Sequence, residues 1–266
     1  MKIRFTKMHG IGNDFIVIDQ LKTQYNLSPK EISLLSHRQF GIGFDQLLII
    51  EASSNPEAEF RYRIFNADGD EVEQCGNGAR CFYHYIKKKN LSKHTQISVE
   101  TKSGLIVLSK KNEDLISVDM GKPVFKKNIS DLFTFVSTGN PHAVLNPMNK
   151  SDKWADAIKY AKELQNNTTL FPKGVNVGLM KIIDKNNLRL KVLERGSGLT
   201  LACGSGACAA TAVAIQKKLV NTPVIVNMDG GDLIIDWDGL NSIIMSGPAK
   251  IVFEGEFDLN LIRKYE

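Results

Sequence analysis

The chain has 266 residues, 42% of them hydrophobic and 24% charged, which is typical of a globular protein with one large or two small domains. Its net charge is only +5, from 34 basic and 29 acidic residues, and its longest basic run, at 87–89, falls where a predicted helix ends. These values argue against nucleic-acid binding, and no segment is apolar enough to span a membrane. The N-terminus lacks a signal-peptide pattern, so we expect a cytoplasmic protein.

The first half of the chain opens with GN at 12–13 and a strand-like apolar run. SPKE at 28–31 predicts a helix, because it combines a capping box with proline at the first helical position. A strand with the amide side chain Gln46 follows, and an alternating strand at 61–66 leads into the phrase CGNGA at 75–79. A helix from that phrase and a meander of strands complete the half.

The second half repeats this order at nearly constant offsets. They are 128 for CGNGA and its second copy CGSGA (203 − 75), 127 for the two GN dipeptides (139 − 12) and 130 for the amides Gln46 and Asn176 (176 − 46). Offsets that drift so little over half the chain indicate two homologous halves.

The turns of each meander predict largely antiparallel sheets, and the helix after each thiol is apolar on several faces, as a buried helix should be. The predicted class is therefore α/β (α+β), with two pseudo-symmetric halves, each a largely antiparallel or mixed sheet wrapped around a central helix. We expect one half at 1–120 with Cys75 and one at 121–255 with Cys203. A C-terminal tail at 256–266 should pack back on the first half.

The repeated thiols suggest acid–base chemistry. A cysteine at a helix N-terminus meets N–H groups without intrahelical partners and a positive dipole end, so its thiolate is favoured. The same N–H groups suit a substrate carboxylate. If the halves face each other, Cys75 and Cys203 would flank the carbon next to that carboxylate, and one could remove its proton while the other delivers a new one. This is racemase or epimerase chemistry.

Other uses of the cysteines fit less well. A reducing cytosol argues against disulfides, and intervals of five residues before Cys81 and four before Cys208 do not match the usual zinc spacing. We expect these two cysteines to be core residues and predict no metal site. A calcium loop at 66–71 is rejected because Glu71 occupies the position that needs glycine.

Longer landmarks cover most of the chain. In order they are HGIGNDF at 9–15, GIGFDQ at 41–46, NADG at 66–69, CGNGARC at 75–81, GNPH at 139–142, VNVG at 175–178, ERG at 194–196 and ACGSGAC at 202–208. In these phrases the chain resembles the diaminopimelate epimerase family. The resemblance implies that family's fold and a homodimer acting on a small amino acid. It also implies interconversion of LL- and meso-diaminopimelate for lysine and peptidoglycan synthesis, without a cofactor.

The resemblance also implies residue roles. Cys75 and Cys203 resemble the catalytic pair. The residues that would hold the reacting carboxylate are Gly76, Asn77, Gly204 and Ser205. Those that would form the polar wall around the distal amino-acid head are Asn13, Gln46, Asn66, Asn140, Asn176 and Arg195. His142 and Glu194 would tune the second cysteine and receive the substrate ammonium. Leu199 departs from the pattern, in which an acidic residue often precedes the threonine, and this bears on loop contacts there.

Two alternatives stay open. A proline racemase or hydroxyproline epimerase would share the cysteine pair, but its cyclic substrate would leave the distal residues with less to do. A redox sensor or a noncatalytic amino-acid-binding module would use the thiols or the polar wall without epimerisation. A racemisation assay and mass spectrometry of the resting thiols would separate these classes.

Overall fold

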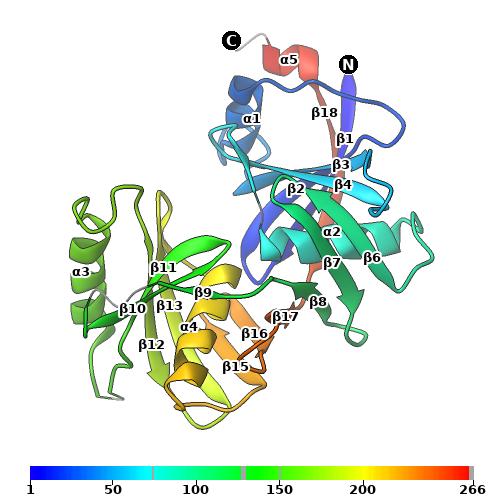
Figure 1. Cartoon of the computed structure of the whole chain (residues 1–266). Coiled ribbons are helices and arrows are strands. Elements are labelled where there is room, and N and C mark those ends of the chain that lie inside the picture. Colours follow the sequence, from blue (N-terminus) through cyan, green and yellow to red (C-terminus); the bar gives the residue numbers. More distant parts are fainter. Residues whose placement is uncertain (74, 127–129, 150, 264–266) are drawn as a thin grey trace. The chain divides into compact units, whose positions relative to one another are not determined.

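The computed structural model describes residues 1–73, 75–126, 130–149 and 151–263 (Figure 1). They form two compact units: unit 1 is Met1–Val118 with the segment from Pro248 onward, and unit 2 is Asp119–Gly247. The sequence had placed 248–255 in the second half. The structure assigns them to unit 1 because strand β18 (Lys250–Asp258) pairs with β1 (Lys2–Gly10) along nearly its whole length.

Unit 1 is a mixed sheet with helices on both faces. Its further strands are β2 (Asn13–Asp19), β3 (Gln46–Ala52), β4 (Phe60–Asn66), β5 (Glu71–Val72), β6 (Gln96–Thr101), β7 (Gly104–Lys110) and β8 (Ile116–Asp119), and its helices are α1 (Pro29–Ser36), α2 (Gly76–Lys88) and α5 (Leu259–Arg263). The sheet order is β18-β1-β2-β3-β4-β6-β7-β8. The β2–β3 and β4–β6 pairs are parallel and the other pairs are antiparallel.

Unit 2 repeats this plan. Its strands are β9 (Val124–Phe125), β10 (Phe133–Thr138), β11 (Asn140–Leu145), β12 (Asn176–Ile182), β13 (Asn187–Glu194), β14 (Gly198–Thr200), β15 (Val224–Met228), β16 (Gly231–Asp236) and β17 (Ile244–Gly247), and its helices are α3 (Trp154–Gln165) and α4 (Gly204–Gln216). The order β9-β10-β11-β12-β13-β15-β16-β17 has its parallel pairs, β11–β12 and β13–β15, at the equivalent places.

The internal repeat extends to strand register. Phe15 lies opposite Gln46 in the first parallel pair, and His142 lies opposite Asn176 in the second. Helices α2 and α4 each have 13 residues, and their starts are 128 positions apart (204 − 76). The predicted fold class with two pseudo-symmetric halves is therefore confirmed.

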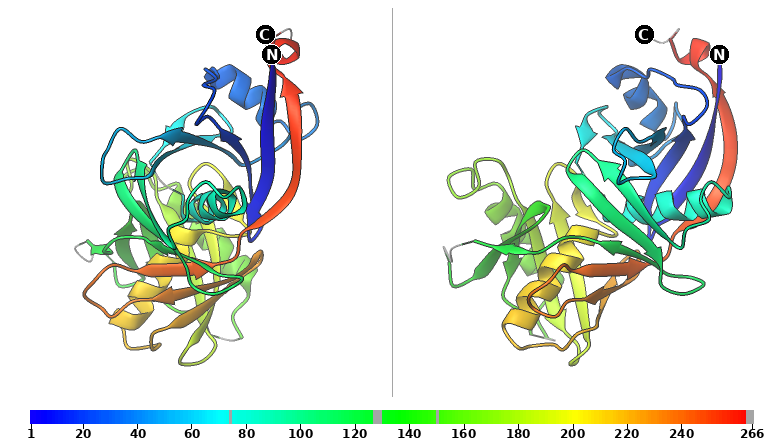
Figure 2. Two further views of the ribbon diagram at one scale, coloured as in Figure 1. Left: turned by 90° about the vertical axis from the view of Figure 1, so that its right-hand side faces the viewer. Right: turned by 45° about the vertical axis from the view of Figure 1, so that its right-hand side comes forward.

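Each sheet curves around one buried helix and carries another helix on its opposite face. Helix α2 contacts β1, β2, β3, β7 and β18, and α4 contacts β10 to β13 and β15 to β16. Figure 2 (left) shows α2 nearly end-on among the strands of its unit. On the opposite faces, α1 packs Ile32 and Leu35 against the sheet of unit 1, and α3 packs Ala161 and Leu164 against that of unit 2.

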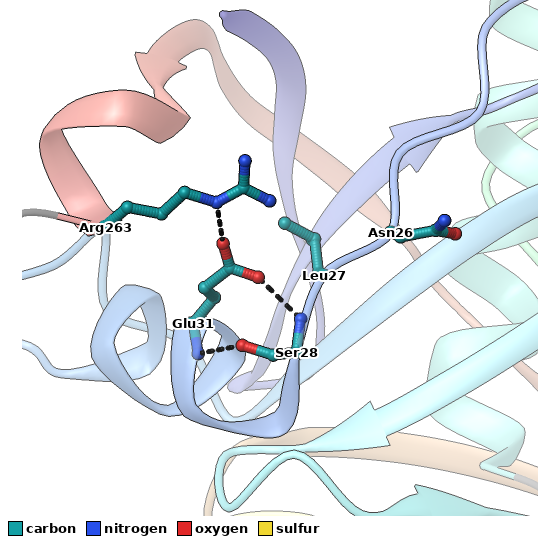
Figure 3. A pocket seen from close by; sticks show the side chains of 5 residues that line it. All are labelled: Asn26, Leu27, Ser28, Glu31 and Arg263. Atoms are coloured by element: carbon teal, nitrogen blue, oxygen red, sulfur yellow. Dashed lines mark hydrogen bonds and ion pairs between the residues drawn. The ribbon is translucent and has the colours of Figure 1, made fainter. Parts of the chain in front are cut away.

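The predicted capping box of α1 is confirmed. The Ser28 hydroxyl accepts from the Glu31 amide, and the Glu31 carboxylate accepts from the Ser28 amide. Arg263 of α5 donates to the same carboxylate at 2.7 Å. Asn26 and Leu27 complete a small pocket beside these three residues, shown in Figure 3, and no residue expected in the active site lines it.

Candidate active site

Cys75 is the residue immediately before α2. Its backbone is extended (φ −139°, ψ 113°), and its carbonyl accepts from the amide of Ala79 at 2.8 Å and from the hydroxyl of Tyr62 at 3.3 Å. The first-turn N–H groups that follow Cys75 have no acceptor within the helix. The half-buried thiol therefore lies beside a positive helix end, as the sequence predicted.

The second glycine of each thiol phrase, Gly78 in CGNGA and Gly206 in CGSGA, has a packing role. A Cβ atom on Gly78 would collide with the buried hydroxyl of Tyr62, and one on Gly206 would lie 2.8 Å from Cγ2 of Val192. Neither glycine has a positive φ. These two glycines therefore allow each central helix to approach its sheet closely.

Cys203 occupies the equivalent place before α4. Its backbone angles (φ −131°, ψ 107°) repeat those of Cys75, and its carbonyl accepts from the amide of Ala207 at 2.9 Å. The side chain is nearly covered, with 4% of the residue exposed.

The sequence predicted a thiol of lowered pKa at both helix starts, and for Cys203 this is wrong. Burial raises the pKa of Cys203 well above its usual value, and the charge of Glu194 raises it further. Hydrogen bonds from Ser205 and from the amide of Gly206 only partly offset these effects. In this structure Cys203 is therefore a protonated thiol at neutral pH.

The residues around Cys75 that the sequence singled out do lie together. The Cys75 thiol donates to Oδ1 of Asn13 across 3.7 Å. The amide of Asn77 donates to the same oxygen at 3.3 Å. Asn77 is almost fully buried in the first turn of α2, so this contact joins the start of the helix to the start of β2.

His142 forms the matching cluster in unit 2. Its Nε2 lies 3.0 Å from Oγ of Ser205, which lies 3.6 Å from Sγ of Cys203. Thr138 donates to the carbonyl of Ser205 at 2.9 Å. Burial lowers the pKa of His142 to about 3, so the imidazole is neutral at physiological pH. Its Nδ1 is buried without a hydrogen-bond partner among the described residues.

The amides expected to bind the distal head pair across strands. Gln46 and Asn66 are opposite each other on β3 and β4, and Nε2 of Gln46 donates to Oδ1 of Asn66 at 2.9 Å. Within the described part of the chain, Oε1 of Gln46 is buried and has no hydrogen-bond partner. The pair therefore keeps a donor group on Asn66 and an acceptor on Gln46 for a ligand.

The equivalent group in unit 2 is built from Asn176, Glu194 and Arg195. Oδ1 of Asn176 accepts from the amide of Arg195 at 2.9 Å, and Thr200 donates to the Glu194 carboxylate. The Arg195 guanidinium is exposed and donates to the carbonyl of Lys173 at 2.6 Å. Thr200, at the end of β14 and three residues before Cys203, was not expected from the sequence.

The expected site residues thus form one set in each unit. The set of unit 1 is Asn13, Gln46, Asn66, Cys75, Gly76 and Asn77, and that of unit 2 is Asn140, His142, Asn176, Glu194, Arg195, Cys203, Gly204 and Ser205. Asn140 lies exposed at the start of β11. Leu199 is also exposed, at 45%.

The structure also bears on disulfides and metal sites. All four cysteines are free thiols. Among the described residues, no three His, Cys, Asp or Glu side chains gather as they would around a metal ion.

Every helix in the described ranges also falls short of the length and apolar character that crossing a membrane requires.

Comparison with known sequences decides the family. The model of the family described as diaminopimelate epimerase matches residues 5–126 and 134–252. The chain belongs to this family. The diaminopimelate epimerase of Aromatoleum aromaticum is 44% identical over 280 residues, covering 98% of this chain and all of the relative. That of Pseudomonas savastanoi is 43% identical over 281 residues, covering 97% of this chain and all of the relative.

Solved structures share the fold at much lower identity. A Bacillus anthracis phenazine biosynthesis protein of the PhzF family matches with a TM-score of 0.72 at 17% identity, over 97% of this chain and all of that one. A hydroxyproline epimerase from Agrobacterium vitis matches with a TM-score of 0.71 at 11% identity, over 96% and 91% of the two chains. At these identities the likeness shows the architecture alone.

Proposed function

We propose that this protein interconverts LL- and meso-2,6-diaminopimelate by cofactor-independent proton transfer at the α-carbon. The observation that carries the proposal is the repeat itself: Cys75 and Cys203 occupy the same backbone position before two equivalent helices. The family membership of the chain agrees with this activity.

The two helix starts would bind the reacting carboxylate. Backbone N–H groups at Gly76, Asn77, Gly204 and Ser205 have no acceptor within their helices, and their positive ends favour an anion. These donors would also stabilise the negative charge that spreads onto the carboxylate when the α-proton leaves. The cysteines would then act on opposite faces of that carbon, one as base and the other as acid, and the centre would invert.

The remaining polar residues would select the substrate. The amides of Asn13, Asn66 and Asn176 and the guanidinium of Arg195 offer donors to a distal carboxylate, and Gln46 and Asn140 would complete the wall. Glu194 offers an acceptor to an ammonium. Because an ammonium beside Glu194 would neutralise its charge, substrate binding would make Cys203 easier to ionise. His142 would act on Cys203 through the hydroxyl of Ser205.

The family to which the chain belongs also suggests a cellular role and an oligomeric state. We propose a cytoplasmic homodimer that supplies lysine and peptidoglycan precursors. Its partner would be a small amino-acid substrate, with neither a nucleic acid nor a membrane involved.

The decisive experiment compares substrates and cysteine variants. The wild-type protein should epimerise LL-diaminopimelate and leave proline and hydroxyproline unchanged. Cys75→Ala and Cys203→Ala should each lose at least about 10³-fold in kcat, and the double variant should be little worse, because the thiols act as a unit. Cys81→Ala is the matched control, since that thiol is buried inside α2. Efficient racemisation of proline would favour the proline racemase alternative, and full activity in either single variant would refute the thiol pair.

A further inference from the structure

The Cys75 thiol faces an amide whose orientation is fixed from its far end. Nδ2 of Asn13 donates to the Asp45 carboxylate at 2.9 Å, which leaves Oδ1 directed at the sulfur. A carboxylate can only accept hydrogen bonds. Rotating the Asn13 amide by half a turn would therefore place two oxygens against each other, so Asp45 determines which end of the amide Cys75 meets.

Arg80 fixes the orientation of the side-chain amide of Asn77, which lies next to Asn13. Nη2 of the fully buried Arg80 donates to Oδ1 of Asn77 at 3.0 Å, and a guanidinium can only donate. The Asn77 nitrogen must then point at Asn13, whose oxygen accepts from it. Both anchors thus leave the Asn13 oxygen as the group that Cys75 meets.

Asp45 is itself held by an ionic network. Arg38 bridges Asp45 and Asp14 with contacts of 2.8 Å to each, and Lys7 contacts Asp14 from the other side. Burial disfavours the charge on Asp14, but hydrogen bonds from Arg38 and Lys7 outweigh it and lower the pKa to about 2. The amides of Asp14 and Asp45 also bond to the opposite carboxylate, at 3.1 Å each. Asp14 is therefore ionised at neutral pH, and Arg38 joins it to Asp45.

Unit 2 has no such anchor at the equivalent position. The counterpart of Asp45 at the offset of 130 is Val175, whose buried side chain has no hydrogen-bond acceptor. Cys203 instead meets the hydroxyl of Ser205, which can either donate or accept, and the carboxylate of Glu194, which can only accept. The two thiols therefore share a backbone position but meet different side chains, an anchored amide at Cys75 and a hydroxyl with a carboxylate at Cys203.

We propose that Asp45 is a positioning residue that keeps the oxygen of Asn13 toward the Cys75 thiol, so that Cys75 is held as a hydrogen-bond donor before substrate binds. Tyr62 from β4 and Cys81 and Arg80 from α2 also lie near Cys75, and of these Arg80 bears on Asn13 through its hydrogen bond to Asn77. The inference rests on the proposed epimerase site, but its first test needs no substrate.

The test measures alkylation of Cys75 by iodoacetamide against pH, with peptide mapping by mass spectrometry, in Asp45→Ala and Asp45→Asn. Asparagine keeps one oxygen for Asn13 and removes the charge, whereas alanine removes both. If orientation matters, the midpoint of the Cys75 profile should lie roughly half a pH unit lower in Asp45→Ala than in Asp45→Asn. The Cys203 profile should stay the same, and Asp114→Asn, an exposed carboxylate of unit 1, should change neither thiol.

Equal midpoints in the two Asp45 variants would overturn the inference, since only the lost charge would then matter. Asp45 is 43% exposed at its side chain, so folding should survive, and Asp45→Ser replaces the alanine if it does not. Epimerase kinetics form a separate arm, in which Asp45→Ala should lower kcat about tenfold more than Asp45→Asn does. If the alkylation midpoints of the two Asp45 variants differ but the wild-type protein shows no epimerase activity, the inference about Asp45 stands and the proposed function is refuted.

Discussion

Nε2 of His142 lies 3.0 Å from Oγ of Ser205, inside a unit that leaves none of the histidine exposed to solvent. The contact makes the imidazole the far end of a chain that reaches the Cys203 thiol through one hydroxyl. Because burial lowers the pKa of His142 to about 3, this chain carries no positive charge at neutral pH. His142 can thus orient the hydroxyl but cannot pull the thiol toward ionisation as an imidazolium would.

The buried imidazole should make folding stability depend on pH. The pKa is about 3 in the folded state and 6.5 for an ordinary histidine, so only the unfolded chain gains this proton between those values. The contribution of the neutral, buried His142 to the free energy of unfolding is complete above pH 6.5. It is lost as pH falls toward 3, by up to about 1.4 kcal/mol per pH unit. Urea unfolding of His142→Gln should show a shallower decline than wild type over this window.

His94→Gln is the control for that measurement, because the His94 side chain is 73% exposed. Its unfolding free energy should follow wild type at each pH. The same slope in His142→Gln and wild type would mean that the imidazole is protonated inside the fold.

The close approach of α2 to its sheet predicts the cost of filling Gly78. Gly78→Ala should destabilise unit 1 by about 1–3 kcal/mol, because the new methyl group meets the Tyr62 hydroxyl, even though alanine favours helices. Combining it with Tyr62→Phe removes the oxygen and should recover part of the loss. Chemical unfolding of the two single variants and the double variant measures this coupling. Strict additivity would show that the Tyr62 hydroxyl is not the obstacle.

The loop at Arg195 should control affinity for the distal end of the substrate. Asn176→Leu leaves the amide of Arg195 without its acceptor, and Arg195→Met removes the charge. Each change should raise KM for diaminopimelate by roughly tenfold or more, since a polar site that loses a partner discriminates strongly. Steady-state kinetics with diaminopimelate and proline provide the measurement, and Lys173→Met is the control because Arg195 donates to the backbone carbonyl of Lys173, which the substitution keeps. Unchanged KM in both variants would place the distal end of the substrate elsewhere.

Local patterns in the sequence predicted much of this structure. The offset of 128 identified both thiol helices, and the offsets near Asn13 and Gln46 correspond to the observed strand register. Capping and periodicity are predictable because each depends on residues close together in the sequence. The duplication is predictable because its two copies can be compared directly in the sequence.

Features that depend on distant partners were missed. The pairing of β1 with β18 joins the two ends of the chain, so no local signal marks Pro248 as the point where the chain returns to unit 1. The elevated pKa of Cys203 depends on near-complete burial and on Glu194, and neither can be deduced from its position at a helix start. Asp45 lies within the phrase GIGFDQ, but its position between Arg38 and Asn13 depends on the folded structure.

The fate of the α-proton tests the two-thiol mechanism most directly. The protein is incubated with LL-diaminopimelate in deuterated water, and product and recovered substrate are analysed at early time by mass spectrometry. If one thiol removes the proton and the other delivers a solvent-exchanged one, the product carries deuterium at the inverted carbon while the recovered substrate stays largely protiated, in both reaction directions. Early product that retains the substrate's own hydrogen at that carbon would contradict the pairing of Cys75 with Cys203.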